Sequence, residues 1–360
     1  MRTGGTVLDR PNKLCFASDY MEGAHPLILE RLVSTNMEQT GGYGSDHHSE
    51  HARELIRKAC AAPSAEVQFL VGGTQANACV IGCVLRAWQG VIAASTGHVS
   101  QHEAGAIEFG GHKVMELPGD EGKLVADQVE AFVTAFERDQ NRDHMVAPGM
   151  VYISQPTEYG TLYSLAELEA LAAVCRAHDL RLYVDGARLA YALSTPQNDV
   201  TLTDIARLCD VFSIGGTKCG CLFGEAVVVP DPALIPHFLT QIKQRGALLA
   251  KGRVAGVQFE VLFEDGLYER IGSSAIEQAT RIRNRLREVG VVLPIDSPTN
   301  QVFLQLDDKR LELFGRSVEY SFWEKPDATT TVIRLATSWA TRAENVDRLL
   351  ELLWRLGSDD

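Results

Sequence analysis

The sequence predicts an α/β protein with a mostly parallel central sheet, helices on both of its faces, and a smaller C-terminal α/β domain. Short β-rich runs alternate with amphipathic helical stretches between about residues 50 and 245, which is the pattern of repeated strand–helix–strand units. After about residue 250 this alternation stops. We therefore expect an N-terminal segment at 1–20, a large domain at 21–250 and a small domain at 251–360.

Seven β-rich runs predict the strands of the large domain. They are Val67–Val71, Val91–Ala94, Lys113–Leu117, Met150–Ser154, Arg181–Val184, Val211–Ile214 and Ala226–Val229. The helical stretches between them are Ala52–Ala62, Gln75–Trp88, Val125–Arg138 and Leu165–His178. The last of these has the clearest start, because Ser164 and Glu167 stand at capping-box spacing before an apolar stripe.

Four elements are expected in the small domain. A helix is predicted at Ser274–Val289, strands at Gln301–Leu306 and Thr331–Ala336, and a final helix from about Ala343 to Leu356.

The composition narrows the class of protein. The 360 residues are 45% hydrophobic and 22% charged, with a net charge of −13, which is typical of a soluble globular protein. The acidic balance argues against nucleic acid and anionic membranes as partners. We find no signal-like or membrane-spanning run, and the eight cysteines are expected to be reduced thiols. The sequence thus predicts a cytoplasmic protein.

The first candidate site is Gly72-Gly73-Thr74-Gln75-Ala76-Asn77, between a predicted strand and helix. Glycines at such a turn let backbone N–H groups approach a phosphate at the helix N-terminus, so Gly73 and Thr74 are candidate phosphate ligands. The alternative is an ordinary turn capped by Thr74. The Gly-x-Gly-x-x-Gly spacing of dinucleotide-binding proteins is missing.

The second candidate is Asp185-Gly186-Ala187-Arg188, which directly follows a predicted strand. Open parallel sheets bind their ligands at the carboxyl ends of strands. An acid there can hydrogen-bond a protonated ring nitrogen, and an arginine can hold a carboxylate or phosphate. The alternative is an aspartate at a helix N-terminus that pairs with its own arginine.

The third candidate is Thr217-Lys218, flanked by Gly215, Gly216 and Gly220 after a buried β-run. A desolvated lysine has a lowered pKa and becomes a nucleophile that can form a Schiff base. The alternative is a surface lysine in a hairpin. Asp185 and Lys218 are separated by about one helix and one strand, so both can lie at the same edge of the sheet.

Together these motifs resemble the low-specificity threonine aldolase branch of the β-eliminating lyases, which are fold-type-I pyridoxal-phosphate enzymes. The resemblance extends over most of the chain. The further segments that carry it are Ser18-Asp19, Tyr43-Gly44-Ser45-Asp46, His98 with Glu103, Arg253-Val254-Ala255-Gly256, and Arg334 within Ile333–Trp339.

The resemblance implies the role of each candidate residue. Lys218 would carry pyridoxal phosphate and Asp185 would keep its ring nitrogen protonated, while His98 would stack on the ring and help to remove the substrate's hydroxyl proton. The substrate carboxylate would be bound by Ser18, Arg188 and Arg334. Thr217 would adjoin the cofactor, and Arg253 is expected to reach the phosphate from a neighbouring subunit of a homo-oligomer, a tetramer or a dimer with shared active sites.

One departure concerns the substrate. Glu158 stands where the resembled family has a histidine near the substrate hydroxyl. The predicted reaction is cleavage of a β-hydroxy-α-amino acid of the threonine or allo-threonine type to glycine and an aldehyde. Alternatives are β-elimination or transamination with the same cofactor, a non-catalytic scaffold of this fold, and a dinucleotide oxidoreductase.

A metal site is not expected. His47 and His51 stand at i, i+4 spacing and His48 lies between them, but no third ligand is near them in the sequence.

Overall fold

The computed structural model describes residues 13–354, which group into two compact units. The larger unit comprises residues 22–273, and the smaller one combines residues 274–354 with the N-terminal residues 13–21. The larger unit thus continues beyond residue 250, where the sequence analysis put the boundary.

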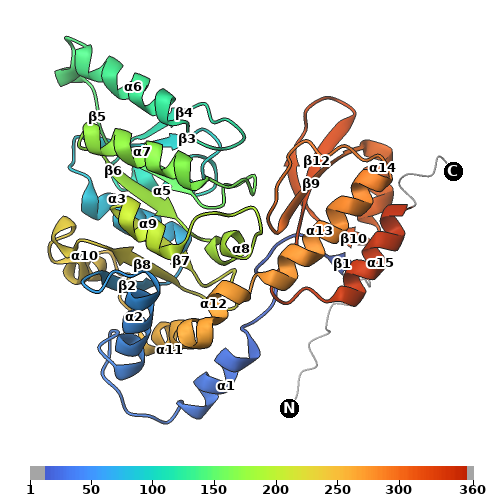
Figure 1. The fold of residues 1–360 in the computed structure, drawn as a ribbon, viewed down its shortest axis with the longest axis horizontal. Coiled ribbons are helices and arrows are strands. Elements are labelled where there is room, and N and C mark those ends of the chain that lie inside the picture. The colour runs from blue at the N-terminus through green and yellow to red at the C-terminus, as the bar shows by residue number, and fades with distance from the viewer. Residues whose placement is uncertain (1–12, 355–360) are drawn as a thin grey trace, which may run out of the picture. The chain divides into compact units, whose positions relative to one another are not determined.

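The larger unit contains a seven-stranded sheet in the order β2-β8-β7-β6-β5-β3-β4 (Figure 1). Its strands are β2 (Glu66–Leu70), β3 (Gln89–Ala94), β4 (Val114–Leu117), β5 (Ala147–Ser154), β6 (Arg181–Asp185), β7 (Val211–Gly215) and β8 (Glu225–Val229). All seven predicted strands are present, and the mostly parallel sheet is confirmed. Only β8 runs against its neighbours. The loop between β7 and β8 is too short for the crossover that parallel pairing needs.

Helices cover the sheet on both faces (Figure 1). The helices are α1 (Pro26–Ser34), α2 (His47–Ala59), α3 (Gly73–Val84), α4 (His98–Gln101), α5 (Ala106–Phe109), α6 (Ala126–Arg138), α7 (Leu165–Ala177), α8 (Leu189–Leu193), α9 (Leu202–Leu208), α10 (Phe238–Gln244), α11 (Arg253–Phe263) and α12 (Leu267–Arg270), with short 3-10 turns at Arg142–His144, Pro232–Leu234 and Glu264–Gly266. The predicted capping box is confirmed, since Ser164 and Glu167 bond each other's backbone N–H groups. Every residue of β7 and β8 is buried, as expected for strands covered on both faces.

Helix α11 belongs to the larger unit because its buried Glu260 is bonded to basic side chains of α1 and α2. The carboxylate pairs with Arg31 Nη1 at 3.0 Å, His48 Nδ1 at 2.7 Å and His51 Nδ1 at 2.8 Å. A buried carboxylate without such partners would cost several kcal/mol. These contacts fix α1, α2 and α11 to one another, which explains why the unit extends past residue 250.

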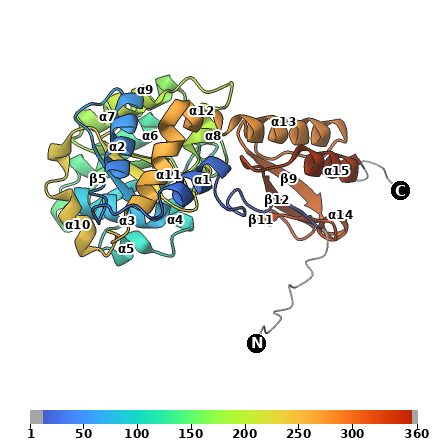
Figure 2. The same ribbon diagram turned by 90° about the horizontal axis from the view of Figure 1, so that it is seen from below.

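The smaller unit has a three-stranded antiparallel sheet in the order β11-β12-β9, and α13 and α15 pack together on one side of it (Figure 2). Its elements are β1 (Leu14–Cys15), α13 (Ser273–Glu288), β9 (Gln301–Asp307), α14 (Asp308–Gly315), β10 (Val318–Glu319), β11 (Ser321–Glu324), β12 (Thr330–Ala336) and α15 (Ala343–Trp354). The parallel pair β1–β10 brings the N-terminal segment into this unit, where Leu14 and Phe16 join its core. The two helices and two strands predicted here are all present.

Among the helices of residues 13–354, we find none whose length and apolar character would let it cross a bilayer.

Candidate active site

The candidate site lies where the parallel strands β5, β6 and β7 end. Ser154 ends β5 and pairs in register with Asp185, which ends β6. Lys218 follows the end of β7 by three residues, in the loop to β8. The carboxyl ends of parallel strands form the usual ligand-binding edge of such a sheet.

Asp185 is a buried acid, 4% exposed, whose two oxygens are held by three donors. Its Oδ2 accepts hydrogen bonds from Tyr152 at 2.7 Å and from Asn77 Nδ2 at 2.9 Å, and its Oδ1 accepts one from the Ala187 N–H at 2.9 Å. Burial alone would raise the pKa of Asp185, but the nearby His98 charge and these hydrogen bonds outweigh burial and lower it. Asp185 is therefore a fixed anion that can hold a cationic ring nitrogen.

Asn77 joins Asp185 to a second buried acid, Glu103. Its Nδ2 donates to both carboxylates, at 2.9 Å to Asp185 and 2.7 Å to Glu103 Oε1, and its Oδ1 accepts from Tyr183 at 2.6 Å. The orientation of the amide is fixed, because the reverse would point its oxygen at two carboxylates. Glu103 Oε1 also bonds His98 Nδ1 at 2.9 Å. His98 and Asp185 are thus linked through two buried side chains.

Glu158 is buried on the same edge of the sheet. Its Oε1 accepts a hydrogen bond of 2.8 Å from Ser154. Burial is the main cause that raises the pKa of Glu158, and the charge of His98 opposes it. A carboxylate with a raised pKa is a better proton acceptor than a surface glutamate.

Glycines let the lysine loop pack tightly against its neighbours. A Cβ at Gly215 would lie 2.3 Å from the Ala187 carbonyl oxygen, and one at Gly216 would lie 2.8 Å from that of Gly224. The Gly224 N–H donates to Thr217 Oγ1 at 3.0 Å, and Tyr191 donates to the Lys218 main-chain oxygen at 2.6 Å. These contacts fix the backbone that carries the half-buried Lys218 side chain.

Glu225, the first residue of β8, is a further buried acid near the lysine. Its pKa is raised to about 8, mainly by burial and by the Asp185 charge, while Lys218 and a hydrogen bond from Thr217 oppose the shift. The sequence analysis did not single out Glu225.

Gly72 and Gly73, at the start of α3, leave its N-terminus open. Gly72 is the N-cap residue and no side chain caps the helix, so the alternative of a turn capped by Thr74 is wrong. A Cβ added at Gly72 or Gly73 would meet no atom within 4 Å. Backbone N–H groups at the positive end of a twelve-residue helix that has no side-chain cap suit an anion such as a phosphate.

Two predicted substrate ligands lie in the smaller unit. Arg334, on β12, donates to Gln301 Oε1 at 3.0 Å, to Ser321 Oγ at 3.3 Å and to the Ala17 carbonyl at 3.4 Å. Ser18 Oγ is buried and has no hydrogen-bond partner among residues 13–354. The contact between Arg334 and Ala17 brings the N-terminal segment next to the arginine.

Arg253, the first residue of α11, is bonded within the chain. Its guanidinium donates to the main-chain oxygens of Thr35 at 2.9 Å, Asn36 at 3.3 Å and Glu38 at 3.5 Å. These bonds tie α11 to the segment between α1 and α2.

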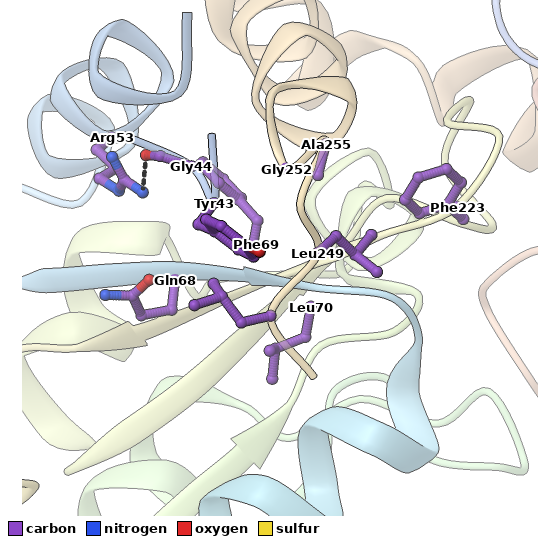
Figure 3. Close-up of a pocket in the computed structure, with 11 residues that line it drawn as sticks. Tyr43, Gly44, Arg53, Gln68, Phe69, Leu70, Phe223, Leu249, Gly252 and Ala255 are labelled. Carbon is purple, nitrogen blue, oxygen red and sulfur yellow. Dashed lines mark hydrogen bonds between the residues drawn. The ribbon is translucent and has the colours of Figure 1, made fainter. Parts of the chain in front are cut away.

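A hollow beside β2 also contains an arginine (Figure 3). Arg53 donates to the main-chain oxygens of Val67 at 3.0 Å and Gly44 at 2.8 Å, and to Glu50 at 3.1 Å. Its guanidinium carbon lies 5.6 Å from the centre of the Phe69 ring. These bonds hold Arg53 to the Tyr43–Gly44 segment and to β2.

The histidine-rich segment has a nearby third ligand that the sequence did not reveal. Glu38, His47 and His48 each place one ligand atom within 4.8 Å of the others. His48, however, bonds Glu38 through Nε2 at 2.9 Å and Glu260 through Nδ1 at 2.7 Å. Burial opposes its protonation, but the two carboxylates outweigh burial and raise the pKa of His48. His48 is thus held by two carboxylates, and the absence of a metal here stays a prediction.

The comparisons with known proteins agree with this geometry. The sequence model of the beta-eliminating lyase family matches residues 16–309. The low-specificity L-threonine aldolases of Pseudomonas sp. strain NCIMB 10558 and Pseudomonas aeruginosa are 32% and 30% identical, over 82% and 93% of this chain and 85% and 95% of their own lengths. The structure of Leishmania major threonine aldolase superposes with a TM-score of 0.92 at 43% identity, covering 96% of this chain and 99% of the other.

The mostly parallel sheet, the smaller α/β unit, and the acid and lysine at one sheet edge define a protein of the fold-type-I class. The chain belongs to the beta-eliminating lyase family.

Proposed function

We propose that this enzyme is a pyridoxal-phosphate-dependent aldolase that cleaves threonine-type β-hydroxy-α-amino acids to glycine and an aldehyde. The main support is the ionised, buried Asp185 on the same sheet edge as Lys218, in a chain similar to threonine aldolases. Threonine and allo-threonine are the proposed substrates.

The side chains at this edge fit pyridoxal phosphate. The Lys218 amine would hold the aldehyde carbon, the Asp185 carboxylate would hold the ring nitrogen, and the open N-terminus of α3, with Gly73 and Thr74, would hold the phosphate. Thr217 and His98 would adjoin the cofactor. When bound, pyridoxal phosphate supplies a sink for the electron pair left on Cα when a bond to Cα breaks.

The protein chooses which bond breaks by holding the substrate. We propose that Arg188, Arg334 and Ser18 bind the substrate carboxylate and so fix the orientation of the Cα–Cβ bond. Arginine suits this task because its planar donors bind a carboxylate in a defined geometry. Glu158 would lie near the substrate side chain and accept the hydroxyl proton.

The assembly and location are also proposals. The proposed assembly is a homo-oligomer, a tetramer or a dimer, with shared active sites. In it, Arg253 would reach the phosphate bound by a neighbouring subunit. The expected location is the cytoplasm. The acidic net charge supports a small-molecule substrate rather than nucleic acid or membrane partners.

The products released from threonine, allo-threonine, serine and phenylserine test the proposed reaction. We expect glycine plus acetaldehyde from the first two and glycine plus benzaldehyde from phenylserine. If the main activity were the release of pyruvate and ammonia from serine, the reaction would be β-elimination. If the amino acids were converted to 2-oxo acids only when an amino-group acceptor is added, the reaction would be transamination. A protein that binds no cofactor would be a scaffold.

Replacing Arg334 with alanine should raise KM for amino-acid substrates roughly ten- to a hundred-fold, the usual cost of one charge-assisted hydrogen-bonding partner. Cofactor content, measured by absorbance, should stay unchanged. Arg316, an exposed arginine of the same unit, provides the matched control in Arg316→Ala. Loss of cofactor rather than of substrate affinity in Arg334→Ala would make Arg334 a phosphate ligand.

Glu158 should make the enzyme discriminate against 3-hydroxyaspartate. Like charges a few ångströms apart in a partly buried site repel by on the order of a few kcal/mol at an effective dielectric near 20. We therefore expect kcat/KM for threonine to exceed that for 3-hydroxyaspartate, and Glu158→Gln to narrow the gap while slowing cleavage. Glu116→Gln, at an exposed position, removes the same charge as a control. Equal use of both substrates by the unmodified enzyme would mean that Glu158 points away from the substrate.

A further inference from the structure

Glu103 is a buried acid in contact with His98. Its side chain has no exposed surface, and its hydrogen bonds from His98 Nδ1 and Asn77 Nδ2 converge on one oxygen, Oε1. Its other oxygen, Oε2, is buried and has no hydrogen-bond partner within residues 13–354. An ionised carboxylate in such a place needs a cation in contact with it, and His98 is the ion-pair partner at 2.9 Å.

The charges around His98 favour its imidazolium form. Besides Glu103, two acids act on it, Asp185 at the end of β6 and Glu158 in the loop after β5, and Lys218 opposes them from the loop after β7. The His102 ring lies 5.7 Å away, centroid to centroid. Burial alone would lower the pKa of His98, but Glu103, Asp185 and Glu158 together outweigh burial and raise it from its ordinary value of 6.5.

We propose that Glu103 is a positioning residue that keeps His98 protonated, so that His98 serves the reaction as a hydrogen-bond donor and not as a base. Nδ1–H donates to Glu103, and this bond leaves Nε2–H as the donor for an oxygen of the substrate or cofactor. Asn77 also holds Glu103 in place, through the same Oε1 oxygen. The proton acceptor for the substrate hydroxyl is then another group, and the buried carboxylate of Glu158 has the raised pKa suited to that task.

This inference rests on the proposed aldolase function for the role of His98 in turnover, but the protonation state is a property of the protein alone. It can be measured on cofactor-free enzyme. Failure of the aldolase assay and failure of this inference are therefore separate results.

The test is an NMR titration of the His98 imidazole in cofactor-free protein that carries isotope-labelled histidine. The signal of His98 is the one that is missing in the His98→Gln variant. We expect both ring nitrogens to be protonated at neutral pH, and Glu103→Gln to lower the His98 pKa by about one unit or more, because the loss of one contacting charge has that size. Glutamine can still accept the Nδ1–H bond, so the geometry is retained.

Glu108→Gln is the control, since this exposed glutamate belongs to the same segment and carries the same charge. It should leave the His98 titration unchanged. In the active enzyme, a limb of the pH–rate profile that depends on protonated His98 should move to lower pH in Glu103→Gln and stay in place in Glu108→Gln. Two results would overturn the proposal. One is a neutral His98 at pH 7 in the unmodified protein, which can be seen without any variant. The other is a His98 titration in Glu103→Gln that is the same as in the unmodified protein.

Discussion

Replacing Lys218 with alanine should abolish turnover and leave the large unit folded. Loss of a covalent catalytic group commonly lowers kcat by on the order of a thousand-fold or more. The fold should persist because the lysine backbone is held by Tyr191, through the main-chain oxygen at 2.6 Å, and by the glycines packed around the loop. None of these contacts needs the lysine side chain.

Three measurements check this expectation. Circular dichroism should match that of the unmodified enzyme, the visible absorption of a lysine-bound cofactor should vanish, and the release of aldehyde from threonine should fall to background. Lys243→Ala is a matched control outside the site, because this side chain lies over the Tyr43 ring at 4.1 Å. Retained turnover in a folded Lys218→Ala protein would remove Lys218 from its assigned role.

Replacing Asp185 with asparagine should leave cofactor bound but raise the barrier by about 3 kcal/mol or more, which corresponds to a rate loss of roughly a hundred-fold. The negative charge that keeps the ring nitrogen protonated would be lost. The local geometry adds to this cost. Both Asp185 oxygens accept hydrogen bonds, from Tyr152, Asn77 and Ala187, and an amide nitrogen at either position would face a donor.

The measurement for Asp185→Asn is kcat with saturating threonine, together with cofactor content from absorbance. A fall in kcat at full cofactor occupancy is the expected result. Near-normal kcat would contradict the assignment, and complete loss of cofactor would mean that Asp185 serves binding more than chemistry.

Hydrophobic pattern and turn chemistry were sufficient to predict most of the fold. The strands of the large unit are buried apolar runs, and such runs are recognisable in one sequence. The reversed direction of β8 was not predicted, because strand direction depends on the connection rather than on the run itself. The continuation of the large unit to residue 273 was also missed, since it depends on the pairing of Glu260 with residues about two hundred positions away.

Local motifs pointed to Asp185 and Lys218, because each follows a strand and adjoins glycines. They did not point to the network that sets the charges of these groups. Tyr152 and Ser154 come next to Asp185 only through the register of β5 with β6, and the role of Asn77 requires the packing of α3 on the sheet. Glu225 was missed for the same reason. Two polar residues at alternate positions of an otherwise apolar strand, as in Tyr152–Ser154, were the signal that could have been used.

The most direct test of the central claim is to reduce the purified enzyme with borohydride and locate the modified lysine by peptide mass spectrometry. Lys218 is half-buried at the ligand-binding edge of the sheet, so we expect one pyridoxyl group per chain, attached to Lys218, and loss of activity in proportion to its formation. A pyridoxyl group on a different lysine, or an active enzyme that carries none, would contradict the account.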